Sequence, residues 1–113
     1  MTALYIGGAH QGKTALARRL HGGQTDYVEE LHALVRRTLT QGGDAQALLP
    51  ALRGKVVICD EVGCGIVPLD PQERAWRETV GRLCCALAEE ADLVVRVWAG
   101  LPQVLKGSLP CTC

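Results

Sequence analysis

The sequence predicts an α/β fold, in which helices cover a small, mainly parallel β-sheet. Three short apolar segments alternate with segments of helical character along the 113 residues. The middle segment, Val56–Cys59, is apolar at every position, which is typical of a parallel strand with helices on both faces. Such alternation forms right-handed α/β units. We therefore expect a single domain over residues 1–113, with residues 107–113 as a loose tail.

Each predicted strand is an apolar run that ends at turn-forming or acidic residues. The first strand, Ala3–Ile6, ends at glycines, and Val56–Cys59 ends at an Asp-Glu pair. The third strand, Leu93–Trp98, ends at an Ala-Gly pair. Three strands make a thin sheet, so its edges need cover from helices or from another subunit.

Two helices are predicted between the first and second strands. Lys13–Leu20 has helical composition and ends before glycines, which often terminate helices. Asp26 and Glu29 then have the spacing of a capping box, which predicts the start of a second helix. The apolar residues expected on one face of this second helix are Val28, Leu31, Val35 and Leu39.

The longest helix is predicted over Gln72–Glu90. Asp70 is suited to cap its N-terminus, and Pro71 lies in the first turn, where a missing N–H costs nothing. The apolar stripe of this helix is Trp76, Val80, Leu83 and Leu87. We expect both Trp76 and Trp98 to be core residues.

The composition excludes several classes of function. Twelve Lys and Arg balance twelve Asp and Glu, so the chain lacks the excess of positive charge that nucleic-acid binding requires. The apolar runs are too short for a membrane span, and the segment Met1–Ile6 lacks the features of a signal peptide. We therefore expect a cytoplasmic protein. Its six cysteines should then be reduced, and their spacing favours small buried residues over a metal site.

The most informative motif follows the first strand. Residues Gly7–Thr14 match G-x-x-x-x-G-K-[ST] between a predicted strand and a predicted helix, which is typical of a P-loop rather than a chance glycine-rich turn. In such a loop the backbone N–H groups bind phosphates. Lys13 would contact the β- and γ-phosphates as a catalytic residue, and the Thr14 hydroxyl would hold Mg²⁺. The expected nucleotide-binding residues are Gly7, Gly8, Ala9, His10, Gln11, Gly12, Lys13 and Thr14.

An acidic pair completes the predicted site. Asp60 and Glu61 follow the second strand, where P-loop proteins carry a carboxylate for the metal ion. We predict that Asp60 is the metal partner and that Glu61 is a catalytic residue that activates the attacking hydroxyl. The alternative is an acidic pair that only ends a strand.

Residues 61–68 carry a resemblance to a known family. They read E-V-G-C-G-I-V-P, which resembles the E-V-G-x-G-I-V-P signature of the adenosylcobinamide kinase / adenosylcobinamide-phosphate guanylyltransferase family. Residues 7–14 are similar to that family's G-G-A-R-S-G-K-S. The resemblance covers the first twenty residues and residues 27–106.

The resemblance implies a three-layer, RecA-like P-loop fold and a homotrimer. Members of the family phosphorylate the aminopropanol hydroxyl of adenosylcobinamide with ATP or GTP. They then transfer GMP from GTP through a guanylylated histidine, late in cobalamin biosynthesis. The expected ligands are thus Mg²⁺, a nucleoside triphosphate (GTP or ATP) and a cobinamide corrinoid.

The chain also departs from the family pattern. The family's histidine segment, R-I-x-x-H-x-x-x-R-P, has no counterpart, and His32 precedes Arg36 at the right spacing but without the proline. We interpret His32 as a helix-surface histidine and His21 as a residue at a helix end. The sequence therefore predicts a shortened kinase whose guanylyltransferase step is doubtful. The alternative is a non-catalytic nucleotide-binding protein derived from the same family.

Overall fold

The computed structural model of the chain describes residues 1–23, 25–62 and 69–110. It contains a five-stranded sheet with the strand order β2-β3-β1-β4-β5. The strands are β1 (Ala3–Gly7), β2 (Tyr27–Val28), β3 (Val56–Asp60), β4 (Leu93–Trp98) and β5 (Leu101–Lys106). The helices are α1 (Lys13–His21), α2 (Leu31–Thr40), the 3₁₀ helix η1 (Ala45–Leu48), α3 (Leu49–Leu52) and α4 (Pro71–Glu90). All strand pairs are parallel except β4–β5, which confirms the α/β fold with a mainly parallel sheet.

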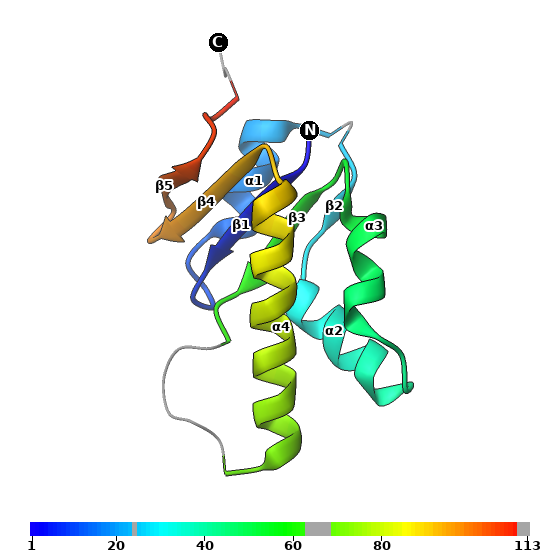
Figure 1. The fold of residues 1–113 in the computed structure, drawn as a ribbon. Helices are drawn as coiled ribbons and strands as arrows, with labels where there is room; N and C mark the ends of the chain where they lie inside the picture. Colours follow the sequence, from blue (N-terminus) through cyan, green and yellow to red (C-terminus); the bar gives the residue numbers. More distant parts are fainter. Residues whose placement is uncertain (24, 63–68, 111–113) are drawn as a thin grey trace.

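The sheet is the middle of three layers (Figure 1). On one face, α1 packs on the buried residues Tyr5 and Ile58. On the other face, α2, α3 and α4 pack on Leu4 and Val57. Adjacent strand residues face opposite layers, so continuously apolar strands bury both of their faces, as the sequence predicted. Among the residues that the structure describes, no helix combines the length and the hydropathy that a membrane span needs.

Helix α4 confirms the longest predicted helix. The Asp70 side chain accepts a hydrogen bond from the backbone N–H of Gln72 at 2.8 Å, and Pro71 is the first helical residue. The residues that α4 buries are Val80, Leu83, Cys84 and Leu87. Trp76 packs against the same core, in agreement with its predicted place.

The predicted start of the second helix is wrong. Tyr27–Val28 forms β2, a parallel edge strand paired with Val56 and Val57, and α2 begins only at Leu31. The carbonyl of Asp26 accepts a hydrogen bond from the backbone N–H of Val56 at 2.9 Å. Pairing with the sheet therefore overrides the local capping signal, and Glu29 forms an ion pair with Arg18 of α1 instead of capping α2.

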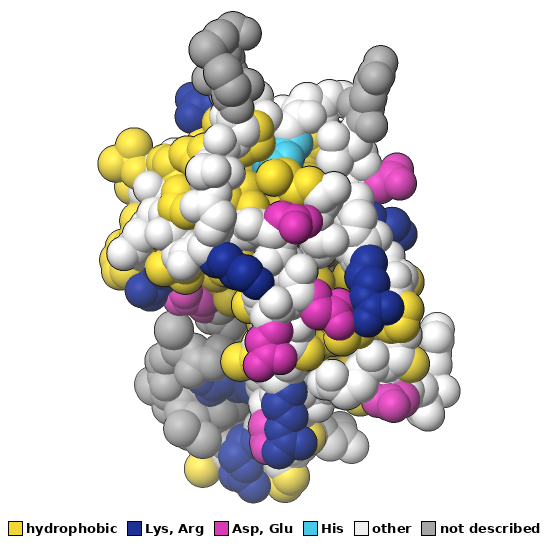
Figure 2. All heavy atoms as spheres, turned by 45° about the horizontal axis from the view of Figure 1, so that its top comes forward, with side chains coloured by type: hydrophobic (Ala, Val, Ile, Leu, Met, Phe, Trp, Pro, Cys, Tyr) yellow, Lys and Arg dark blue, Asp and Glu magenta, His cyan; other side chains and the backbone are white. Residues whose placement is uncertain are grey.

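The sheet also has an edge strand that the sequence did not predict. β5 pairs with β4 in an antiparallel hairpin, whose turn residues Ala99 and Gly100 have positive φ angles of 49° and 77°. Such angles suit a two-residue hairpin turn. All of β5 is exposed, and Trp98 is 57% exposed, so its prediction as a core residue is wrong. Figure 2 shows hydrophobic side chains gathered on this side of the molecule, at the upper left.

The cysteines follow the prediction in part. Cys59 and Cys84 are buried and lie against each other between β3 and α4, whereas Cys85 is exposed. A hydrogen bond with Cys84, together with burial, raises the pKa of the Cys59 thiol well above its usual range. These two thiols therefore act as small core residues. Cys64, Cys111 and Cys113 lie outside the described residues, as does the end of the predicted tail, while Leu109 packs against the core on the α1 side.

We expect the substitution of Gly107 by alanine to lower the stability of the fold strongly. Its φ is 79°, and a Cβ atom would lie 2.1 Å from the carbonyl oxygen of Asp92. Gly54 has a φ of 78° but no heavy atom within 4 Å of its Cβ position. We expect Gly107→Ala to lower the free energy of unfolding by about 3 kcal/mol and Gly54→Ala by about 1 kcal/mol. Urea unfolding of both variants measures this, and equal losses would contradict it.

Candidate functional site

The predicted phosphate loop lies between the end of β1 and the start of α1. Its first residue, Gly7, packs so tightly that a Cβ atom would lie 2.5 Å from the carbonyl oxygen of Val97 in β4. His10 and Gly12 adopt positive φ angles of 62° and 83°. Glycine is thus required at the first position by close packing and favoured at the sixth by backbone conformation.

Gln11 anchors this loop to the β4–β5 turn. Its side-chain Oε1 accepts a hydrogen bond from the backbone N–H of Ala99 at 2.7 Å. Its carbonyl oxygen accepts a second one from Gly100 at 2.7 Å. No signal in the sequence predicted this contact, because it depends on a hairpin far along the chain.

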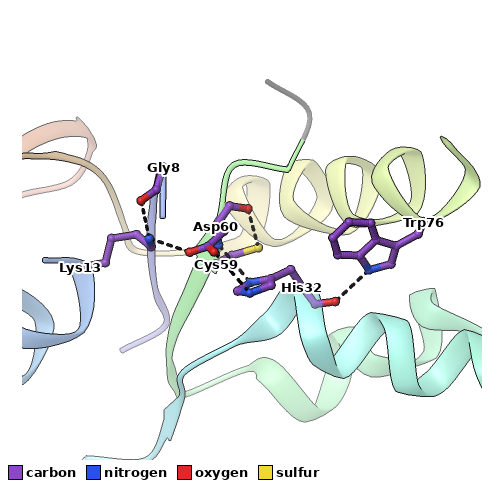
Figure 3. A network of polar contacts seen from close by, with 6 residues as sticks. All are labelled: Gly8, Lys13, His32, Cys59, Asp60 and Trp76. Carbon is purple, nitrogen blue, oxygen red and sulfur yellow. Dashed lines mark hydrogen bonds and ion pairs between the residues drawn. The ribbon is translucent and has the colours of Figure 1, made fainter. Parts of the chain in front are cut away.

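Lys13 and Asp60 form the centre of the site (Figure 3). The ammonium of Lys13, a residue only 6% exposed, lies 2.7 Å from Oδ1 of Asp60. It also donates a hydrogen bond to the carbonyl oxygen of Gly8 at 2.8 Å. The register of the sheet explains why Lys13 and Asp60 are in contact, because Gly7 at the end of β1 pairs with Asp60 at the end of β3. The two motifs predicted separately from the sequence thus lie together.

His32 is a site residue that sequence reasoning missed. It lies in the first turn of α2, is 17% exposed, and accepts a hydrogen bond at Nδ1 from the backbone N–H of Asp60 at 3.1 Å. Its Nε2 lies 3.5 Å from Oδ2 of the same residue. The interpretation of His32 as a helix-surface histidine is therefore wrong. Its place depends on β2, which brings the start of α2 beside β3.

A cavity of about 320 Å³ opens beside this group. It is lined by Ala9, His10, Gln11, Gly12, Lys13, Thr14, Ala15, Glu29, Glu30, His32, Ile58 and Asp60. The loop, the end of β3 and the start of α2 thus form one pocket. Of the residues predicted to bind nucleotide, only Gly7 and Gly8 are not among its lining residues.

Glu61 lies apart from this pocket. Its carboxylate is paired with Arg96 of β4, with Oε1 3.0 Å from Nε and Oε2 3.2 Å from Nη2. Arg96 in turn lies over the ring of Trp98, 4.7 Å from its centroid. Glu61 lines a second cavity of about 150 Å³ together with the α4 residues Val80, Gly81 and Cys84, and Asp60 borders both this cavity and the larger pocket.

The donor set around Lys13 suits Mg²⁺ bound together with phosphates. Thr14 and Asp60 offer a hydroxyl and a carboxylate to the same cavity. Within residues 1–23, 25–62 and 69–110, no three His, Cys, Asp or Glu side chains gather as a metal site. Mg²⁺ in nucleotide sites takes only one or two protein ligands and completes its shell with waters and phosphates. Two oxygen donors therefore fit this ion.

The model of a family described as cobinamide kinase / cobinamide phosphate guanyltransferase matches residues 36–105, more than half of the chain. The chain belongs to this family. The resemblance drawn from residues 61–68 is thereby confirmed.

A bifunctional relative is similar over part of its length. The bifunctional adenosylcobalamin biosynthesis protein CobP of Pseudomonas aeruginosa is 38% identical over 69 residues. These residues make up 58% of this chain and 40% of CobP, so the match covers less than half of that relative.

The family match and the pocket overlap only in part. Asp60 and Glu61 lie within the matched residues of the cobinamide kinase / cobinamide phosphate guanyltransferase family. The loop 7–14 and His32 precede residue 36, where the match begins. Membership of the family thus rests on the part of the chain from α2 to β5, whereas the pocket rests on the geometry described above.

Proposed function

We propose that this chain is a cytoplasmic, nucleotide-dependent kinase of cobalamin biosynthesis that phosphorylates adenosylcobinamide with GTP or ATP. The observation that carries the proposal is the buried Lys13, held between the loop carbonyl of Gly8 and the carboxylate of Asp60 beside a pocket of about 320 Å³. Residues 1–113 would then act as a single P-loop nucleotide-binding domain. Family membership supports the pathway and the type of reaction.

The residues of the pocket have separate roles in this proposal. The N-terminus of α1 and the backbone N–H groups of residues 7–14 bind the phosphates. Lys13 exchanges Asp60 for the β- and γ-phosphates and stabilises the charge on the transferred group. Thr14 and Asp60 hold Mg²⁺, which neutralises phosphate charge when it is bound.

Glu61 remains our proposal for the residue that activates the acceptor hydroxyl. It directly follows Asp60, so a small change of the chain at the end of β3 moves both carboxylates. In the structure its oxygens are held by Arg96. The proposed role therefore requires that the acceptor displaces this ion pair or that Arg96 itself contacts the acceptor.

A non-catalytic nucleotide-binding protein is the second candidate. It is favoured by the partial match to the bifunctional CobP, because the aligned residues make up 40% of CobP and the residues that bind its substrates need not lie in that part. Loss of the guanylyltransferase step is supported by the sequence of residues 1–113, in which no segment matches the family's histidine motif.

Nucleotide consumption with and without adenosylcobinamide distinguishes the two candidates. A kinase releases GDP or ADP in proportion to added adenosylcobinamide and produces its phosphate, detected by mass spectrometry. A non-catalytic protein binds the nucleotide in calorimetry but gives no product. Lack of nucleotide binding in both experiments would contradict either candidate.

We also propose that the chain self-associates, with a trimer as the expected form. β5 is the last strand of the sheet, no strand of the described residues pairs with its outer side, and it exposes Leu101 at 70% and Leu105 at 57%. Exposed apolar edges favour association. Sedimentation equilibrium at micromolar concentration should show a trimer, and Leu101→Lys with Leu105→Lys should shift it towards monomer. A monomeric wild-type protein would contradict this expectation.

A further inference from the structure

We infer that His32 is a positioning residue, which fixes the carboxylate of Asp60 for the metal-bound nucleotide. The inference rests on the proposed nucleotide site and adds a residue that lies outside both the loop motif and the family match. His32 holds two parts of Asp60 at once, because Nδ1 contacts its backbone and Nε2 faces its side chain.

The hydrogen-bond pattern of β3 explains why Asp60 needs this contact. The backbone N–H of Val56 points to β2, where it donates to Asp26, and that of Glu61 points to β1, where it donates to Gly7. Successive N–H groups of a strand point to opposite neighbours, so the N–H of Asp60 points to the β2 side. The pairing of β2 with β3 ends at Val57 of β3, so β2 does not reach Asp60. The imidazole of His32 accepts the hydrogen bond that a longer β2 would otherwise accept.

The hydrogen bond from the Asp60 N–H to His32 also defines the tautomer of the imidazole ring. A backbone N–H can only donate, so Nδ1 of His32 must offer a lone pair. In the neutral ring the proton then lies on Nε2, which faces Oδ2 of Asp60 at 3.5 Å. This arrangement orients the carboxylate with Oδ1 towards Lys13, at 2.7 Å, and Oδ2 towards His32.

α4 supports His32 from behind. The carbonyl oxygen of His32 accepts a hydrogen bond from Nε1 of Trp76 at 2.9 Å (Figure 3). The Trp76 ring lies under the guanidinium of Arg36, 3.9 Å from the ring centroid, and Arg36 pairs with Glu73 of α4. The first turn of α2 is thus fixed to a long, well-packed helix, and the imidazole is held with it.

The consequence concerns the state with nucleotide bound. When Lys13 turns to the phosphates, Asp60 loses its ammonium partner, and the contact with His32 remains to hold the carboxylate towards the metal. His32 should therefore determine how much Mg²⁺ tightens nucleotide binding. It should have a smaller influence on binding without Mg²⁺, because the loop and Lys13, rather than Asp60, then hold the phosphates.

Two variants at this position separate positioning from packing. His32→Phe keeps a flat ring but removes both contacts with Asp60. His32→Asn places an amide oxygen near the position of Nδ1, so it preserves the acceptor for the Asp60 N–H and loses only the contact with the carboxylate. The dissociation constant of GTP is measured by calorimetry for each protein, in Mg²⁺ and in EDTA.

We expect His32→Phe to reduce the Mg²⁺-dependent gain in affinity by about 10- to 100-fold, the usual effect of removing a partner of a metal ligand. The affinity in EDTA should fall by a clearly smaller factor than the affinity in Mg²⁺, and His32→Asn should recover part of the Mg²⁺-dependent loss. An unchanged Mg²⁺ gain in His32→Phe, or an equal loss in both buffers, would overturn the inference.

Nitrogen NMR of the ligand-free protein keeps the inference distinct from the proposed function. The ring nitrogens of His32 should show the Nε2–H tautomer, and Asp60→Asn should shift the Nε2 signal. A protein that shows both signals but binds no GTP would overturn the proposed function alone. An Nδ1–H tautomer, or a signal that ignores Asp60→Asn, would overturn the positioning role.

Discussion

Replacing Lys13 by alanine is expected to weaken the binding of a nucleoside triphosphate by about 100-fold. Truncating one partner of a buried, hydrogen-bonded charge pair costs about 2–5 kcal/mol, and about 1.4 kcal/mol corresponds to a factor of ten. Lys13 is 6% exposed and borders the pocket, and its side chain is already ordered, so little further order has to be created when the ammonium exchanges Asp60 for phosphate. Calorimetry with GTP and ATP measures the loss.

Two controls make the Lys13 experiment specific. Lys55→Ala is the same substitution outside the pocket, and it should leave the affinity unchanged. Lys13→Ala also leaves Asp60 without its ammonium partner, which can destabilise the fold. A double variant with Asp60→Asn removes that unpaired charge, so it should recover stability without recovering binding. Equal affinities of the wild type and Lys13→Ala would contradict the proposed site.

No covalent GMP adduct is expected to form on the isolated protein, so labelling with α-labelled GTP should be absent. A histidine nucleophile needs a free lone pair in line with the α-phosphate. Nε2 of His21 lies 2.7 Å from the Tyr5 hydroxyl, at the end of α1 opposite the loop. The lone pair of His32 is already engaged by the Asp60 N–H. His10 borders the pocket, but within the loop that would hold the phosphates.

Denaturing electrophoresis after incubation with α-labelled GTP is the measurement. Transfer from γ-labelled GTP to adenosylcobinamide, in a parallel reaction, shows that the same preparation is active as a kinase. The histidine variants His10→Asn, His21→Asn and His32→Asn provide matched controls. An acid-labile label that one of these three changes abolishes would show that guanylyl transfer is retained.

Much of the fold, and the positions of two motifs of the candidate site, could be predicted from local sequence patterns. The loop motif and the carboxylate after the second strand were both recognised, because each depends on a short stretch of sequence. β2 and β5 were not predicted. A two-residue strand such as β2 is too short to show periodicity. Pro102 disfavours a strand except at the edge of a sheet, which is where β5 lies. Without β2 there was no reason to place His32 beside Asp60.

The roles of the acidic pair show a second limit. Adjacent residues of a strand point to opposite faces, so Asp60 and Glu61 are expected to have different partners, although both border the cavity of about 150 Å³. The structure follows this rule, with Asp60 beside Lys13 and Glu61 beside Arg96. Strand alternation could therefore have separated the two carboxylates at the sequence level, whereas the identity of the Arg96 partner required the strand order.

The attachment of Gln11 to the β4–β5 turn links the stiffness of the loop to that of the outermost strand. The two hydrogen bonds to Ala99 and Gly100 join the loop that we propose to bind phosphates to the hairpin at the edge of the sheet. A molecule that pairs with β5 and restricts its motion should therefore also restrict the motion of the loop 7–14. We expect that a ligand of the loop would then lose less conformational entropy and bind more tightly, without any change in the average shape of the protein. Amide exchange at Ala99 and Gly100 would slow in step with occupancy of either surface.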